Sequence, residues 1–171
     1  MKDVFLLYDT SCFFEIVILN YFMSLTGCEI VYCSLDGQPI QATEGYSVNA
    51  DMALKDVDPQ QIRSFIVPGG DISAINTEEV RAYLRELKSR RVLIGGICAG
   101  VDLLNHAGIL DGLKSTLSAD RDLVNDGRVI TARANAYVDF AIETAKELEL
   151  FEDEADLQET IDFWKYHKRA E

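Results

Sequence analysis

A cysteine lies where a buried strand meets a helix. Residues 92–107 read VLIGGICAGVDLLNHA, and Cys98 directly follows the apolar run. Gly96 and Gly100 permit the sharp turn of a nucleophile elbow, here with cysteine in place of serine. A sulfur atom at a helix N-terminus lies near unpaired N–H groups, which favour the reactive thiolate. The pattern predicts that Cys98 is a reactive nucleophile; the alternative is a small buried hydrophobic residue.

A second glycine-rich turn, PGGD at residues 68–71, ends the preceding apolar strand. Ligands of open α/β sheets bind at the carboxyl ends of the strands. We therefore expect the Gly70 and Ala99 N–H groups to face the Cys98 site and to form an oxyanion hole for an attacked carbonyl. Taken alone, Pro-Gly-Gly is an ordinary turn, and its position one βα unit before Cys98 gives it this meaning.

Three further residues carry chemistry of their own. Glu15 lies in the apolar stretch FFEIVI, where a carboxyl costs free energy unless it is neutral or hydrogen-bonded. A protonated Glu15 is able to donate to the Cys98 thiolate; the alternative is an exposed glutamate on an amphipathic helix. Cys12 is a candidate resolving thiol or auxiliary ligand, or else a buried structural thiol. Arg133, after the last strand, is a candidate contact for an anionic substrate.

The candidate site residues are positioned by strands and helices that alternate along the chain. Apolar runs predict strands at residues 3–9, 29–35, 64–67, 92–97 and 128–131. Helical patterns cover residues 13–24, 76–90 with Asn76 as the N-cap, 99–107, 136–148 and 157–166. Residues 36–58 are mixed and polar, and we expect short strands or a hairpin there. The alternation predicts an α/β fold, a mainly parallel sheet with helices on both faces, in one domain over residues 1–171.

Composition excludes several classes of protein. Hydrophobic residues make up 48% and charged residues 26%, as in an ordinary globular protein. A formal charge of −13 would repel a phosphate backbone, so we expect no nucleic-acid partner. No apolar run is long enough for a bilayer and no signal peptide is visible, so we expect no membrane partner and a cytoplasmic location. Cys28 and Cys33 are too far apart for a metal clamp, and we expect no metal and no cofactor.

The order of these motifs resembles the DJ-1/PfpI (ThiJ) superfamily, which has a class I glutamine amidotransferase-like fold. The resemblance rests on Glu15 in the first helix, VPGGD after the third strand, and the ICAG elbow with a leucine-rich helix ending in AGIL. The segment DGRVITAR, followed by a helix through Val138 and Phe140, resembles the closing strand and helix of that family. The likeness covers nearly the whole chain.

The resemblance implies a flavodoxin-like α/β sandwich and commonly a homodimer. It also implies that Cys98 is the reactive cysteine and Glu15 its acidic partner. The backbone donors of the oxyanion site then fall on Gly69, Gly70 and Ala99.

One departure from that family concerns histidine. Many family enzymes place a histidine partner after the elbow helix, in the strand that here reads KSTLS, where Ser115 or Leu117 stands instead. His106 lies about 12 Å along the elbow helix, and we expect a surface or packing role. His167 lies in a basic C-terminal tail. Without a histidine, the logic of amidotransferases and peptidases is incomplete, so we reject glutamine amidotransfer and doubt peptidase activity.

Two functions remain. In the first, Cys98 attacks a small electrophilic substrate, Glu15 handles the proton, and the chemistry is glyoxalase-, hydratase- or hydrolase-like. In the second, the protein responds to oxidants without substantial turnover, and Cys98 oxidises to a sulfinate held by Glu15. The missing histidine favours the second function or a histidine-independent version of the first.

Overall fold

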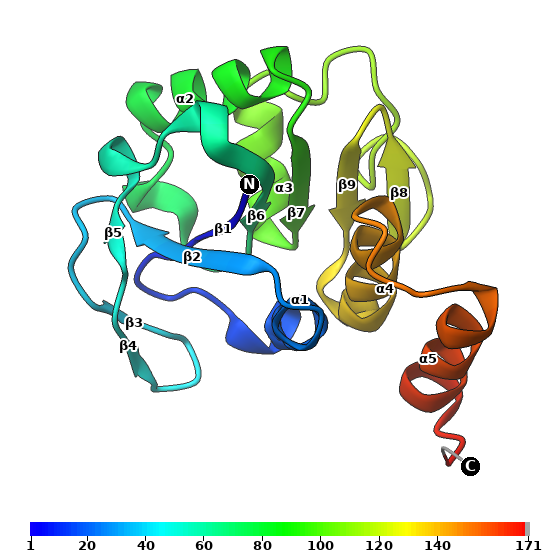
Figure 1. Cartoon of the computed structure of the whole chain (residues 1–171). Helices are drawn as coiled ribbons and strands as arrows, with labels where there is room; N and C mark the ends of the chain where they lie inside the picture. Colours follow the sequence, from blue (N-terminus) through cyan, green and yellow to red (C-terminus); the bar gives the residue numbers. More distant parts are fainter. Residues whose placement is uncertain (170–171) are drawn as a thin grey trace.

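The main sheet has seven strands (Figure 1). The computed structural model describes residues 1–169, and the last two residues of the expected 1–171 domain lie outside that range. The strands are β1 (Lys2–Leu6), β2 (Glu29–Ser34), β5 (Met52–Ala53), β6 (Ile62–Val67), β7 (Leu93–Ile97), β8 (Leu123–Asp126) and β9 (Val129–Ala132). Their order is β5-β2-β1-β6-β7-β9-β8, and every neighbouring pair is parallel except β8 with β9. The predicted hairpin within residues 36–58 is present as β3 (Ile40–Gln41) and β4 (Ser47–Val48).

Helices cover both faces of this sheet, which confirms the predicted fold class. One face carries α1 (Val17–Leu25) and α4 (Tyr137–Glu147), and the other carries α2 (Glu78–Ser89) and α3 (Ala99–His106). Strand β1 shows why: Val4 and Leu6 belong to one hydrophobic cluster, whereas Phe5 belongs to the other. A strand buried on both faces reads as a continuous apolar run because both sets of alternate side chains need an apolar neighbour.

The last helix, α5 (Glu154–Tyr166), lies beyond α4, away from the sheet (Figure 1). Its Trp164 packs edge-on against Phe22 of α1, with ring centroids 5.8 Å apart. The segment between α4 and α5 carries the exposed acidic residues Glu149, Glu152 and Asp153.

The strand order reverses between β1 and β6. From β1 the chain runs outward to β2 and β5, and then returns to build β6, β7 and β9 on the other side. Loops leaving the carboxyl ends of β1 and β6 therefore diverge, which opens a ligand site at this point in α/β sheets. Glu15 follows β1, the PGG turn follows β6 and Cys98 follows β7, so all three arrive at this edge.

Two local predictions were wrong near the termini of helices and strands. Thr77, not Asn76, caps α2, because its hydroxyl accepts from the Val80 N–H at 3.3 Å while the Asn76 side chain contacts the His106 ring. Residues 114–118 form turns instead of a strand, and the Thr116 N–H there donates to the Thr131 hydroxyl at 3.0 Å.

The sequence Asn125-Asp126-Gly127 predicts a hairpin-type turn before the last strand, and a two-residue turn here joins the edge strand β8 to β9. Gly127 and Arg128 both have positive φ, 61° and 66°, and Asp126 pairs with Val129 across them. Consecutive positive φ values define the type I′ turn, whose twist matches antiparallel strands.

Within residues 1–169, no helix has both the length and the apolar character needed to cross a membrane.

Candidate active site

Cys98 occupies a sharp elbow between β7 and α3. Its backbone has φ 54° and ψ −127°, a conformation that side-chain-bearing residues rarely adopt, and its N–H donates to the Ala132 carbonyl at 2.9 Å. A Cβ on Gly100 would lie 2.2 Å from the Val67 carbonyl oxygen, so only glycine lets α3 begin this close to β6. Cys98 is exposed, so the elbow presents its side chain at the surface rather than in the core.

Glu15 is buried beside this elbow, with 2% of its surface exposed. The expected helix over residues 13–24 is broken here: Phe13–Glu15 forms a single 3₁₀ turn, and α1 begins only after Ile16. Two hydrogen bonds hold the turn in place. The Gly69 N–H donates to Glu15 Oε2 at 2.6 Å, and the Phe14 N–H donates to Glu44 Oε1 at 2.8 Å. The carboxyl is therefore directed inward, in contrast to the alternative of an exposed glutamate.

Gly69 lies between the carboxyl and the elbow. A Cβ placed on it would lie 2.7 Å from Cys98 Cβ and 2.7 Å from Glu15 Oε2. Both side chains thus approach the same point, and any larger residue at this position would separate them. The absence of a side chain at position 69 is what lets Glu15 and Cys98 face each other.

The surroundings of this pair raise the pKa of both side chains. Partial desolvation of the thiol beside Glu15, followed by the negative charge of Glu15, raises the pKa of Cys98 to about 11, and the Ala99 N–H opposes the shift. Burial also raises the pKa of Glu15, against the hydrogen bond from Gly69. Desolvation and the neighbouring carboxylate thus oppose the Ala99 N–H, and the expected thiolate at Cys98 stays a prediction.

The backbone donors divide into two roles. The Gly69 N–H is already donated to Glu15, which differs from its expected place among the oxyanion donors. Within residues 1–169, the Gly70 N–H has no protein acceptor. Gly70 adopts φ +143°, and a Cβ on it would lie 2.6 Å from the Thr10 carbonyl oxygen, so this turn also requires glycine. Gly70 and Ala99 remain the candidate donors.

Comparison with known proteins identifies the family of this chain. The family model described as the DJ-1/PfpI family matches residues 1–147. The chain belongs to the DJ-1/PfpI family. A DJ-1 superfamily protein from Agrobacterium tumefaciens is similar in structure, with a TM-score of 0.85 and 28% identity, covering 98% of this chain and 100% of that one.

Two curated relatives are similar in sequence over part of their length. A deglycase from Thermococcus kodakarensis is 32% identical over 106 residues, which are 59% of this chain and 63% of the relative. The HTH-type transcriptional regulator CdhR from Pseudomonas aeruginosa is 38% identical over 84 residues, 49% of this chain and 25% of the regulator. The aligned segment thus spans less than two thirds of either relative.

This DJ-1/PfpI site includes residues that sequence reasoning missed. The buried Tyr8 hydroxyl donates to the Pro68 carbonyl at 2.7 Å, and burial together with the charge of Glu15 raises the pKa of Tyr8. Glu44 arrives from the β3–β4 hairpin, and its charge adds to the upward shift of the Glu15 pKa. A polar residue ending the first strand was a usable signal for Tyr8. Glu44 had no such signal, because only the folded hairpin brings it to the 3₁₀ turn.

Cys12 lies in the same loop as Glu15 and is partly buried. Its N–H donates to the Gly69 carbonyl at 2.9 Å, and its pKa is raised first by burial and further by the charge of Glu15, against a contact from Thr43. Its candidate role as an accessory thiol stays a prediction. Arg133, the other accessory candidate, already has carboxylate partners: its guanidinium contacts Asp122 at 3.1 Å and Asp120 at 3.5 Å.

Neither histidine of this family member is placed as a partner of Cys98. His106 ends α3, at the opposite end of the helix from the elbow, and its Nδ1 lies 2.9 Å from the Asn76 amide nitrogen. His167 caps the C-terminus of α5. At the position expected for the family histidine, Ser115 is buried and Leu117 is exposed. Glu15 is therefore the acid–base group that directly faces the Cys98 side chain.

Proposed function

We propose that this protein acts on small electrophilic carbonyl compounds through Cys98 and Glu15, with glyoxalase-, hydratase- or hydrolase-like chemistry. The observation that carries the proposal is the buried Glu15 carboxyl facing the exposed cysteine across Gly69. A thiol with an adjacent carboxylate has both the nucleophile and the proton acceptor needed to add sulfur to a carbonyl. The relative named a deglycase supports a carbonyl-derived substrate.

In the first step, the Cys98 sulfur attacks an aldehyde carbon of the substrate. The S–C bond forms while the carbonyl π electrons move onto oxygen, and the thiol proton passes to the Glu15 carboxylate. Burial raises the pKa of Glu15, so this carboxylate accepts the proton more readily than an exposed one. The Gly70 and Ala99 N–H groups stabilise the oxyanion. Glu15 then returns the proton to oxygen, which yields a neutral thiohemiacetal.

The pKa of Cys98 favours this sequence over spontaneous oxidation. Partial desolvation and the charge of Glu15 raise the pKa of Cys98 to about 11, which disfavours the thiolate at neutral pH. Oxidation to a sulfinate starts from the thiolate, so it is slow at such a site. Proton transfer to Glu15 during attack removes the need for a standing thiolate.

The test is consumption of glyoxal by the wild-type chain, Cys98→Ser and Glu15→Gln. We expect both variants to lose at least about 10²-fold in kcat/KM, the range for loss of a general base or more. Cys28→Ser at the opposite edge of the sheet is the matched control and should retain activity.

Undiminished turnover by Cys98→Ser would refute the proposal. If the wild-type chain consumes no glyoxal and mild peroxide adds two oxygens selectively to Cys98, the oxidant-responsive function replaces it. Intact mass and peptide mass measurements separate these outcomes.

A further inference from the structure

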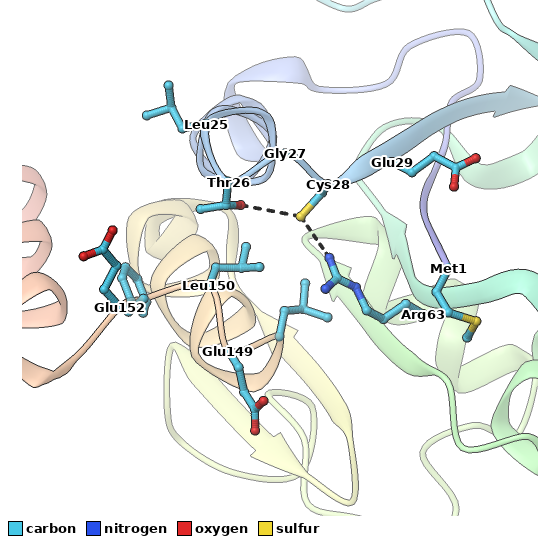
Figure 2. Close-up of a pocket in the computed structure, with 12 residues that line it drawn as sticks. Met1, Leu25, Thr26, Gly27, Cys28, Glu29, Arg63, Glu149, Leu150 and Glu152 are labelled. Carbon is cyan, nitrogen blue, oxygen red and sulfur yellow. Dashed lines mark hydrogen bonds between the residues drawn. The ribbon is translucent and has the colours of Figure 1, made fainter.

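A cavity lies at the edge of the sheet opposite to Cys98. Its volume is about 720 Å³, within the range of small-molecule sites. It is formed by the end of α1, the start of β2, Arg63 of β6 and the segment that follows α4 (Figure 2). Because β1, β2 and β6 are parallel and begin at this edge, the proposed carbonyl chemistry at their other end uses none of these residues.

A thiol in contact with a fixed cation faces this cavity. Arg63 Nη2 donates to Cys28 Sγ at 2.9 Å, and the Thr26 hydroxyl lies 3.5 Å from the same sulfur, as Figure 2 shows. Cys28 is partly buried and lines the cavity wall, so its sulfur is open to a molecule within it.

The guanidinium cannot turn away from this sulfur without breaking a buried ion pair. Arg63 Nε donates to Asp3 Oδ1 at 3.0 Å, Nη2 pairs with the other oxygen, and Asp3 is fully buried. The Ser64 hydroxyl also donates to Asp3, at 2.7 Å. Hydrogen bonding to Asp3 raises the pKa of Arg63, so it stays a cation. Loss of either partner would leave an uncompensated buried charge, and the pair therefore holds the N–H on the sulfur.

The rim of the cavity is negatively charged. Glu29, Glu149 and Glu152 line it, and their carboxylates lie around the margin in Figure 2. Glu29 has Lys2 at 3.8 Å, whereas Glu149 and Glu152 form no ion pair within the described part of the chain. Asp3 neutralises Arg63 and Lys2 neutralises Glu29, so Glu149 and Glu152 outweigh the N-terminal amine of Met1, which also lines the cavity, and the excess charge at the mouth is negative. Such a rim raises the local concentration of cations.

We propose that Cys28 is a thiolation site that selects small disulfides carrying amines. The Cys28 thiolate attacks one sulfur of the disulfide, a new S–S bond forms, and the original S–S bond breaks. The other half departs as a thiolate and takes up the proton that Cys28 released, so the exchange is balanced without a further oxidant. The Arg63 N–H stabilises the negative sulfur during attack, and the glutamates attract the amines.

The test compares two disulfide probes of opposite charge on the full chain. Cystamine carries two amines and dithiodiglycolic acid carries two carboxylates. Initial rates of mass gain on the Cys28 peptide give a rate ratio, which is divided by the ratio for free cysteine under the same conditions. We expect cystamine to be favoured at Cys28 by about tenfold beyond that reference, and Cys28→Ser to lose the adduct. The absence of an adduct at Cys28 with cystamine would overturn the proposal.

Rim variants separate a local effect from the overall charge of −13. Glu149 has φ 55°, a conformation that asparagine tolerates, so Glu149→Asn combined with Glu152→Gln removes two charges without straining the backbone. This double variant should bring the ratio close to that of free cysteine. An unchanged ratio would assign the preference to net charge and refute the site. Arg63→Lys keeps the charge but loses the planar set of N–H donors that binds both Asp3 and Cys28, so it should slow both probes equally. An undiminished rate would refute the role of Arg63.

Discussion

The Gly69 N–H donates to Glu15 Oε2 over 2.6 Å, and this hydrogen bond joins the loop after β6 to the 3₁₀ turn after β1. This hydrogen bond lies between β1 and β6, where the order in which the chain adds strands to the sheet reverses. The contact orients the carboxyl, and the missing side chain of Gly69 leaves room for Cys98. One glycine thus supplies a donor to the acid and space for the nucleophile.

Glu15→Gln should make Cys98 more reactive toward alkylation while it slows carbonyl turnover. Besides burial, the negative charge of Glu15 raises the pKa of Cys98 to about 11, and a neutral amide removes that charge. The glutamine oxygen can still accept from Gly69, so the loop stays in place. Alkylation by iodoacetamide at neutral pH should accelerate by roughly tenfold per unit that the pKa falls, less a partial loss of nucleophilicity. Slower alkylation of the variant would contradict the assigned coupling.

Gly69→Ala should abolish the site by steric conflict. Its Cβ would lie 2.7 Å from Cys98 Cβ and from Glu15 Oε2, so the two side chains must separate. We expect a loss of at least about 10²-fold in kcat/KM, since misplaced groups cost about this much. Gly112→Ala is the control, because nothing lies within 4 Å of that Cβ. The only cost of Gly112→Ala is the strain of a positive φ, so this variant should be slightly less stable and should keep its turnover. Equal turnover in both variants would contradict the prediction.

The pH dependence of stability should reveal the buried carboxyl. Burial raises the pKa of Glu15 above its ordinary 4.5, so the folded state holds this proton more tightly than the unfolded chain. Its stabilising contribution is present below about pH 4.5 and is lost as the pH rises through the raised folded value. The free energy of unfolding of Glu15→Gln, relative to wild type, should therefore increase between about pH 4 and about pH 7. Urea unfolding of both proteins at the two pH values measures this, and a pH-independent difference would refute it.

Strain at the elbow predicts an unusual order of stability among Cys98 variants. Glycine adopts φ 54° and ψ −127° without steric strain, whereas alanine is strained there. Cys98→Gly should be more stable than Cys98→Ala by about 1–3 kcal/mol, although both lack the nucleophile. The free energies of unfolding in urea provide the comparison. Equal stabilities would show that the surrounding chain does not impose the strain.

Much of the architecture is determined by local patterns in the sequence. Continuous apolar runs such as Val4–Leu6 are typical of strands with two buried faces, and their alternation with amphipathic helices indicates a parallel sheet. The elbow at Cys98 follows from glycines between a strand and a helix, since few other turns permit that geometry. These features depend on residues that are close in sequence, which is why they were predictable.

The chemical state of the site was decided by tertiary structure. The sequence indicated a thiolate at Cys98, whereas desolvation and the approach of Glu15 raise the pKa of that thiol. Glu44 and Gly69 fix that carboxyl from loops about 30 and 54 residues away along the chain. The same holds for the contact between Cys28 and Arg63, which are 35 residues apart. A pKa depends on desolvation and on charges that arrive from distant segments, and no local pattern records which segments meet.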